Sequence, residues 1–264
     1  MMGITRRTPG SLLPPTIALG ILLVVWEMYS RLALSTIAGG ERLLPAPTHI
    51  VQALLTNAAV LAPHTWQTLL ETVIGFALAL AVGLGLAVTI DLSPVMRQAI
   101  YPLLVVSQTI PLLAIAPLMV LWFGFGLLPK ILIVGLVCFF PVVVAGADGF
   151  RATDPELVKL FRTFGASDWK IFRMVRFPGA LPSIFSGVRI AITYSVTGAV
   201  WGEYVGAEQG LGIFMQRAQH SFQVSLVFAA VILIAALSIG LFLLTSLAER
   251  MIIPWYFAGR ARSE

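Results

Sequence analysis

The sequence predicts an all-α membrane protein with about six transmembrane helices. Of its 264 residues, 58% are hydrophobic and only 11% are charged, whereas soluble domains carry about 25% charged residues. The mean hydropathy is +0.94, and one crossing of a bilayer core takes about 20 helical residues. The apolar runs are unbroken, unlike the alternating strands of a membrane barrel. We therefore expect a single transmembrane domain over residues 1–264.

The first third of the chain predicts two spans separated by a polar interlude. The apolar run over about 12–34 follows a short basic tail, and it is too long and lacks the cleavage site of a signal peptide. We interpret it as a retained first span. In the interlude, 35–63, we expect Thr48 to cap a short helix whose Ile50, Val51, Leu54 and Leu55 share one face, lying flat on the membrane. The second span follows at about 65–90.

The third predicted span, at about 99–123, follows a tight turn and contains three prolines, Pro102, Pro111 and Pro117. Proline removes a backbone donor, so such a span must bend, and its freed carbonyls need partners in protein or water. This favours a helix that lines a pathway. Glycines of the second span, Gly75, Gly83 and Gly85, are expected to permit close helix approach.

The rest of the chain predicts three more spans, at about 131–149, 183–205 and 222–252, with loops at 124–130 and 206–221. This topology places 13 of the 17 Lys and Arg residues on one side of the membrane. The positive-inside rule then predicts that both termini are cytoplasmic. We see no internal repeat of the kind found in many secondary transporters.

One long polar segment, residues 151–182, interrupts the apolar sequence with nine charged residues. A charge at the bilayer centre costs roughly 2.5–3.5 kcal/mol, so this polar segment must lie outside the membrane. Asp154 and Pro155 suit the start of a helix, and Gly165 suits its left-handed end. Ser167 is suited to cap a second helix that ends at Pro178 and Pro182. A basic, amphipathic helix pair favours docking of a soluble partner over a plain solvated loop.

The stretch GASDWKIFRMVRFPGALPSIFSGVRIA, from Gly165 onward, resembles the cytoplasmic loop signature of binding-protein-dependent ABC-transporter permeases. The resemblance extends from about Leu44 to Trp255. It implies the fold of a type I ABC importer permease in the cell inner membrane. It also implies a coupling role for six residues of the polar segment: Gly165, Ala166, Ser167, Asp168, Trp169 and Phe172.

The same resemblance implies partners for the chain. They are a cytoplasmic ATPase in two copies, an extracytoplasmic substrate-binding protein and a second permease copy, which we expect to form a homodimer. One departure concerns the start of the signature: Lys159-Leu160-Phe161 stands where the family has an acidic residue and two alanines. That change puts in question a salt bridge to the ATPase, but not docking of the Gly165 bend.

Glu203 is the most informative ionisable residue at membrane depth, because such groups are costly unless they face a cavity or a partner. With Trp201 and Tyr204 beside it, it is suited to contact a polar ring in a substrate pathway. A hydrated carboxylate at the interface is an equally good interpretation. Gln108 is a second pathway candidate, although a helix–helix hydrogen bond explains it as well. For Glu27 and Glu71 we expect pairing or snorkelling.

Signatures of catalysis are missing from the sequence. It contains no HExxH, GxSxG, CxxC or phosphate-binding GxxxxGK[ST] motif, so ATP hydrolysis is expected on a partner chain. His49, His64 and His220 lack metal-ligand spacing, and we expect no metal or other cofactor. Cys138 reads as a small buried hydrophobe. The net charge of +5 fits positive-inside loops, so a nucleic-acid partner is not expected.

Two functional classes remain open at this stage. The stretch YSVTGAVWGEYVGAEQGLG, from Tyr194 onward, is most similar to permeases for thiamine-precursor aminopyrimidines, and less similar to those for alkanesulfonate, taurine or nitrate. A self-sufficient secondary transporter is the alternative from a different class; it would use membrane carboxylates as ion or proton relays. A non-transporting scaffold does not explain three prolines in one span.

Overall fold

The computed structural model of this protein describes residues 13–32 and 43–260, and every regular element in these ranges is a helix. The basic tail at 1–10 and residues 35–42 of the interlude lie outside the described residues. The chain forms two compact units, one of Met1–Leu61 with Phe214–Ile232 and one of Ala62–Ile213 with Leu233–Glu264. Each unit has its own apolar core.

The first unit contains α1 (Leu13–Leu32) and α2 (Pro47–Thr56). Ile50 and Ala53 of α2 pack with Ala229, and Trp26 of α1 lies 6.0 Å from Phe228 between ring centroids. The short helix is therefore confirmed, and of the four residues predicted to share a face, Ile50 and Leu54 pack in the core. Val51 and Leu55 are exposed because the unit's core meets the side of α2 that carries Ile50 and Ala53.

The predicted cap of α2 is also wrong. Ala46 is the N-cap and Pro47 occupies the first turn, which leaves Thr48 inside the helix. Its hydroxyl instead donates to Glu27 at 2.8 Å. Glu27 also pairs with Arg31 one turn along α1 at 2.6 Å, so the pairing expected for Glu27 is confirmed.

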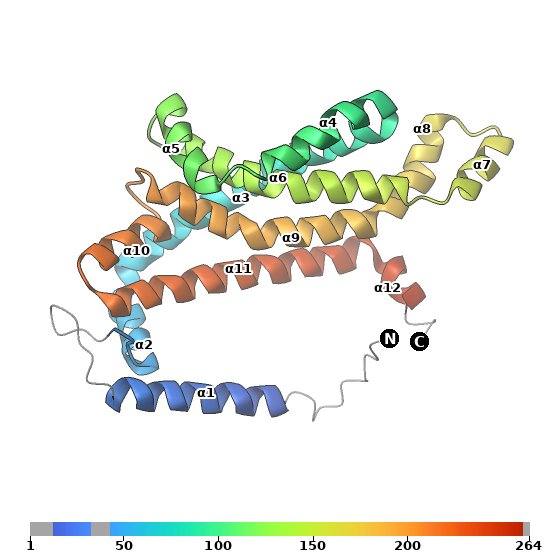
Figure 1. Cartoon of the computed structure of the whole chain (residues 1–264). Helices are drawn as coiled ribbons and strands as arrows, with labels where there is room; N and C mark the ends of the chain where they lie inside the picture. The colour runs from blue at the N-terminus through green and yellow to red at the C-terminus, as the bar shows by residue number, and fades with distance from the viewer. Residues whose placement is uncertain (1–12, 33–42, 261–264) are drawn as a thin grey trace. The chain divides into compact units, whose positions relative to one another are not determined.

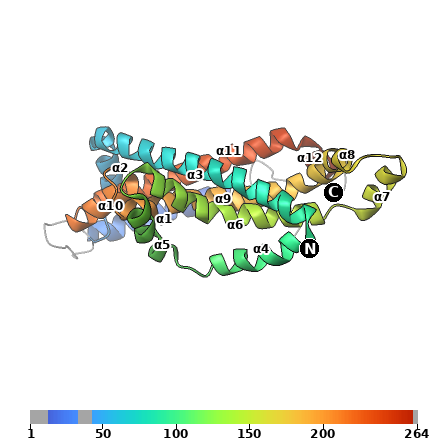
Figure 2. The ribbon, with the colours of Figure 1, turned by 90° about the horizontal axis from the view of Figure 1, so that it is seen from above.

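Three helices of the second unit, α3 (Ala58–Leu92), α6 (Leu127–Arg151) and α9 (Phe177–Tyr204), lie side by side (Figures 1 and 2). Small residues permit this: a Cβ on Gly75 would lie 2.5 Å from Val134, and one on Gly83 would lie 2.9 Å from Val142. Close approach at these two positions is confirmed. It is not found at Gly85, which faces open space. Cys138 is fully buried in the core between these helices.

The third predicted span is broken rather than merely bent. α4 (Pro94–Ser107) and α5 (Leu112–Phe123) meet at an angle of 101°. The break falls just before Pro111, because the residue that precedes a proline is disfavoured in the α region. Pro111 itself is the N-cap of α5 and has an extended backbone. Pro102 and Pro117 are accommodated within helices. The expected turn at 91–98 shrinks to Ser93, whose hydroxyl caps α4.

The polar segment contains α7 (Pro155–Thr163) and α8 (Asp168–Ile171). The expectation that Pro178 and Pro182 end the second helix is wrong. A π-helical turn, η2 (Phe172–Arg176), joins α8 directly to α9, so one helical rod runs from Asp168 to Tyr204. Pro178 sits in the first turn of α9, where its missing N–H costs little because the wide turn has already shifted the hydrogen-bond register.

Four helices of the described residues are long and apolar enough to cross a membrane: α3, α6, the α8–α9 rod and α11 (Val224–Ile252). The bent α4–α5 pair supplies a fifth if it is one span. The first predicted span, 12–34, coincides with α1, which is not among these helices, so its crossing stays a prediction. The predicted loop at 206–221 contains an unexpected helix, α10 (Leu211–His220), and α12 (Pro254–Arg260) follows α11.

A candidate docking segment and translocation groove

Local sequence signals build the bend of the polar segment. The Asp154 carboxylate accepts from the Glu156 amide at 2.8 Å and caps α7, as predicted. At the far end Gly165 has φ +72°. The Gly165 amide donates to the Arg162 carbonyl, and the Ala166 amide donates to the Phe161 carbonyl. These two bonds form a Schellman motif, which confirms the predicted left-handed end.

The second helix starts as predicted, with the Ser167 hydroxyl accepting from the Lys170 amide at 3.4 Å. An exposed ion pair between Arg162 and Asp168, at 3.1 Å, brackets the bend. The polar segment is thus an ordered bend, called the corner below, that spans α7 and α8. Two helix caps and one Schellman motif hold it in shape.

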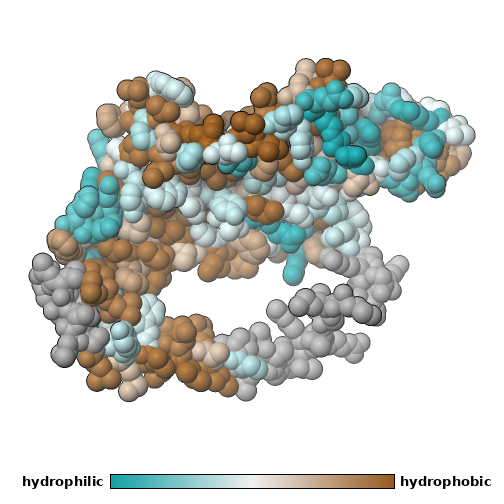
Figure 3. All heavy atoms as spheres, in the orientation of Figure 1, coloured by the Kyte–Doolittle hydropathy of each residue, from teal (hydrophilic) through white to brown (hydrophobic). Residues whose placement is uncertain are grey.

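Large apolar side chains stand exposed on this corner. Phe164 is 79% exposed and Trp169 is 70% exposed, and Leu157 and Leu160 of α7 are also exposed. In Figure 3 a brown patch appears among the teal residues over α7 and α8. Exposed apolar groups ringed by polar ones mark an interaction surface. Phe172 is half-buried beneath it and stacks on Trp169, with ring centroids 5.7 Å apart.

Two contacts anchor the corner to the helix bundle. The Arg176 guanidinium donates to Asp91, at the end of α3, at 2.7 Å. The Phe172 ring lies 5.6 Å from Phe150 of α6, and Ile171 is buried. The polar segment is therefore in direct contact with α3 and α6.

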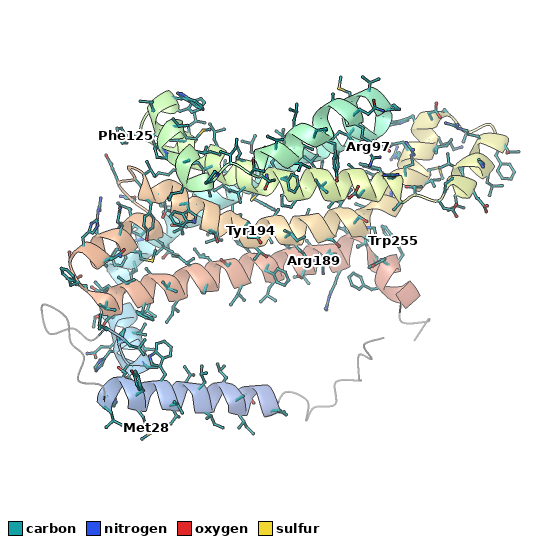
Figure 4. The ribbon with its side chains drawn as sticks, viewed as in Figure 1. Met28, Arg97, Phe125, Arg189, Tyr194 and Trp255 are labelled. Atoms are coloured by element: carbon teal, nitrogen blue, oxygen red, sulfur yellow. The ribbon has the colours of Figure 1, made fainter. Side chains whose placement is uncertain are left out.

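A groove of about 520 Å³ lies where α4 and α5 break, against α6 and α9. Its polar groups are Ser107, Gln108 and Tyr194, and Phe140 and Pro111 supply flat apolar surfaces. Figure 4 labels Tyr194 on α9. The volume lies within the range of small-molecule sites, about 300–1,000 Å³. The break in the span thus brings the sequence-predicted Gln108 to a cavity wall.

Glu203 is placed differently from the expectation. Its side chain is fully buried and accepts from the Thr68 hydroxyl at 2.6 Å and from the Gly212 amide. Trp201 and Tyr204 contact each other, with ring centroids 5.6 Å apart, while the carboxylate is held by α3 and α10. The alternative interpretation, a hydrated carboxylate at the interface, is contradicted because the Glu203 side chain is fully buried. A pathway role for Glu203 stays a prediction.

The structure adds residues that sequence reasoning missed. Tyr194 lines the groove, and its signal was its spacing of seven from Trp201, which puts both on one exposed face of α9. Thr68 was missed because its partner Glu203 lies 135 residues away in the sequence. Glu71 was expected to pair, and it does, with Lys130 at 3.0 Å, but both are buried rather than at an interface. His64 Nδ1 lies 3.0 Å from the Gly210 carbonyl oxygen.

Within the described ranges, no group of His, Cys, Asp and Glu is arranged to hold a metal ion.

Comparison with known proteins identifies the family. Residues 75–256 match the family described as binding-protein-dependent transport system inner membrane component. The chain belongs to this family. The permease is 40% identical over 231 residues to a probable ABC transporter permease of Haemophilus influenzae, covering 88% of this chain and 93% of that one. It is 36% identical over 244 residues to a formylaminopyrimidine transport permease of Halalkalibacterium halodurans, covering 92% and 96%.

More distant relatives carry other substrates in their names. The taurine transport system permease of Escherichia coli is 30% identical over 245 residues, covering 90% of this chain and 88% of that protein. Among solved structures, an inward-facing MetNI methionine ABC transporter matches with a TM-score of 0.66 at 18% identity, over 75% of this chain and 98% of that chain. That likeness confirms the fold of a type I importer permease.

These findings make the protein a multi-pass, non-catalytic membrane subunit of an ABC importer. ATP hydrolysis belongs to a partner chain. The family implies an ATPase and a substrate-binding protein as partners.

Proposed function

We propose that this permease, working as one domain, carries a small polar heterocycle such as a thiamine-precursor pyrimidine. The formylaminopyrimidine permease and the riboflavin transport system permease of Chloroflexus aurantiacus, each 36% identical, are both named for heterocycles. The observation that carries the proposal is the groove at the α4–α5 break. Gln108 and Ser107 offer hydrogen bonds to ring substituents, and Tyr194 and Phe140 offer faces for stacking.

Alkanesulfonate, taurine or nitrate is the second candidate, and the taurine relative supports it. These substrates carry an anionic group that needs cations or several N–H donors. No Lys or Arg is among the described residues that line the groove, which favours the neutral ring. The two candidates are distinguished by uptake and competition.

We propose further that the polar segment docks in a cleft of the ATPase and transmits its closure to the pathway. Trp169 and the Gly165 bend, with Ala166, Ser167 and Asp168, present the docking surface, and Phe172 supports it from below. The exposed face of α9 that carries Tyr194 and Trp201 is suited to a second copy of the chain. Two ATPases would then meet a permease homodimer, with both termini and the polar segment in the cytoplasm.

A secondary transporter would need a free carboxylate at membrane depth. Three carboxylates of the described helices are ion-paired: Glu249 with Arg189 at 3.3 Å (Figure 4 labels Arg189, on α9), Asp91 with Arg176 and Glu71 with Lys130. These ion pairs favour transport driven by a partner ATPase over transport coupled to ions or protons.

Docking is tested by capture of the ATPase. The tagged, detergent-solubilised chain is mixed with the soluble proteins of its own cell, and bound proteins are identified by mass spectrometry. We expect an ATPase that is no longer captured with Trp169→Ala. The control is Trp122→Ala on α5, a tryptophan of similar exposure, which should still capture the ATPase. A chain that binds no ATPase and transports in liposomes without ATP would overturn the proposal.

The substrate is tested in cells that express the permease with its partner proteins. We expect labelled formylaminopyrimidine to accumulate, with the concentration for half-maximal uptake raised by Gln108→Ala. Excess taurine should not compete. Uptake of taurine in place of the pyrimidine would favour the second candidate.

A further inference from the structure

A second cavity, of about 380 Å³, lies at the end of α9 that is farthest from the polar segment. We call it the turn cavity, because it lies between α3, the start of α6 and the turn at residues 206–209. Among the described residues it shares no lining residue with the groove at the α4–α5 break. From Lys130 on its wall to Phe140 in the groove is roughly 15 Å along α6, at 1.5 Å per residue. The turn cavity is therefore a separate site.

One wall of the turn cavity carries a buried ammonium with spare hydrogen-bond donors. The Lys130 side chain is 7% exposed and donates to Glu71 Oε1 at 3.0 Å. Gln67 Nε2 donates to the same oxygen at 2.8 Å, so the polar ends of Lys130 and Gln67 lie together. An ammonium has three N–H donors, and Glu71 is the one acceptor that it reaches among the described residues. This wall therefore offers further N–H groups, while Glu71 balances the charge of Lys130.

The opposite wall is the turn itself, and it carries acceptors. Glu208 and Gln209 line the cavity and are exposed. Within the part of the chain that the structure describes, neither side chain has a hydrogen bond or an ion pair. A carboxylate accepts hydrogen bonds and donates none, and it repels anions. This wall therefore suits the N–H or amino groups of a ligand.

The α5–α6 loop adds a flat aromatic surface to the turn cavity. Phe125, labelled in Figure 4, lines the cavity and is 80% exposed. Its ring lies against Gly206, where an added Cβ would be 2.5 Å from a ring carbon. Gly206 has φ +85°, a left-handed conformation that favours glycine. This contact seats one edge of the ring on the turn and leaves most of its surface open for stacking with a ligand.

We propose that the turn cavity is a second substrate-binding site, which takes a small, neutral, polar ring with both acceptors and N–H donors. The acceptors of the ring face the N–H groups of Lys130, its amino substituents face Glu208, and its plane stacks on Phe125. This inference rests on the proposed function, because an aminopyrimidine is a ring of this class. Alkanesulfonate and nitrate are repelled by Glu208. Taurine, a zwitterion, matches the two charges but not the aromatic surface.

The position of the turn cavity gives the two sites an order. The 28 residues of α9 span roughly 42 Å at 1.5 Å per residue, which exceeds the bilayer core of about 30 Å. The turn cavity therefore lies at the face of the membrane opposite to the polar segment. With the polar segment in the cytoplasm, as proposed, a ring released outside meets the turn cavity first and the groove second.

The site is tested by substrate protection of a cysteine in the turn cavity. Gln209→Cys is made in the full chain, which is placed with its ATPase in lipid nanodiscs; the native Cys138 is buried and gives a low background. We expect formylaminopyrimidine to slow thiol labelling of Gln209→Cys. Labelling of Leu128→Cys, an exposed position of the same region that does not line the cavity, should not change. Equal protection by taurine, or none by the pyrimidine, would overturn the proposal.

The ligand contacts are tested in the Gln209→Cys background. Phe125 and Glu208 are exposed, so their substitution should leave the fold intact. Phe125→Ala should raise the pyrimidine concentration for half-maximal protection by about two- to tenfold, the loss of one aromatic contact. Phe125→Tyr keeps the flat ring and should leave this concentration nearly unchanged, whereas Glu208→Gln should raise it. Each variant is measured with and without the pyrimidine, which cancels changes in the reactivity of the thiol. No effect of Phe125→Ala would overturn the proposal.

A second cysteine separates this inference from the proposed function. Ser107→Cys reports occupation of the groove. We expect the pyrimidine to protect both cysteines, and protection of Gln209→Cys to persist when Gln108→Ala weakens the groove. Protection of Ser107→Cys alone would overturn the turn cavity as a site and keep the groove as the substrate site. Protection of neither cysteine, together with no uptake of the pyrimidine, would overturn the proposed function as well.

Discussion

Arg176 at the base of α9 and Asp91 at the end of α3 form an ion pair of 2.7 Å, although 85 residues separate them in the sequence. The Asp91 side chain is 7% exposed and the Arg176 side chain is 33% exposed. The pair lies where the polar segment enters the helix bundle. It connects the proposed docking surface to two of the three packed helices of the second unit.

Replacing Arg176 with Met should destabilise the permease, because it leaves the Asp91 carboxylate buried without a partner. We expect a loss of about 2 kcal/mol in the free energy of unfolding, less than the 3–5 kcal/mol of a wholly buried pair, since Arg176 is one third exposed. Thermal unfolding in detergent measures it. The double variant Asp91→Asn with Arg176→Met should recover most of the loss, and a single variant no less stable than the double would contradict this account.

Substitutions at Gly165 should uncouple ATP hydrolysis from transport in a graded way. There is open space for a Cβ, so Gly165→Ala should lower the free energy of unfolding only through its left-handed backbone, by about 1–2 kcal/mol. Gly165→Asn should be milder, and Gly165→Pro cannot adopt φ +72° at all. We expect the Pro variant to fold, but to lose substrate-stimulated ATPase activity in proteoliposomes with its partners. Unchanged uptake by the Pro variant would count against the docking role.

Two glycines of the packed helices should respond in opposite ways to alanine. A Cβ on Gly187 would collide with Ala145 and lie 2.5 Å from the Pro141 carbonyl oxygen, so Gly187→Ala should cost about 1–3 kcal/mol by overpacking. Gly85 has nothing within 4 Å, and Gly85→Ala should be neutral or stabilise by about 0.5–1 kcal/mol through helix propensity. Melting temperatures of the two variants provide the check. Equal effects would show that α6 and α9 can separate at Gly187 without cost.

Removing the Lys130 charge should be among the most destabilising single changes in the second unit. Lys130→Met leaves Glu71 buried beside Glu203 without a cation, for which about 3–5 kcal/mol is expected. Adding Glu71→Gln should rescue much of that loss, and the yield of folded protein in detergent measures both. Failure of Glu71→Gln to rescue would indicate that Lys130 acts through packing of its hydrocarbon chain and not through its charge.

Much of the fold and part of the candidate site follow from short-range sequence patterns. Asp154, Gly165 and Ser167 were recognisable because a helix cap is formed within about five residues of chain. Gln108 was recognisable as a polar residue among prolines. By contrast, the continuous helix through Pro178 was not predicted, because the π-helical turn before it has no simple sequence signature. The place of Ala53 on the core face of α2 was also missed, because it depends on Ala229, far along the chain.

The amino-acid sequence alone determined that this chain is a helical membrane protein with one shaped polar corner and no catalytic motif. Hydropathy and capping carry that information locally. Only the tertiary structure decided what the carboxylates do. Glu203 meets Thr68 across 135 residues and Lys130 meets Glu71 across 59, and no periodicity records such pairs. The physical reason is that burial and charge pairing depend on which helix faces pack together, and in this bundle that depends on where small residues allow backbones to approach.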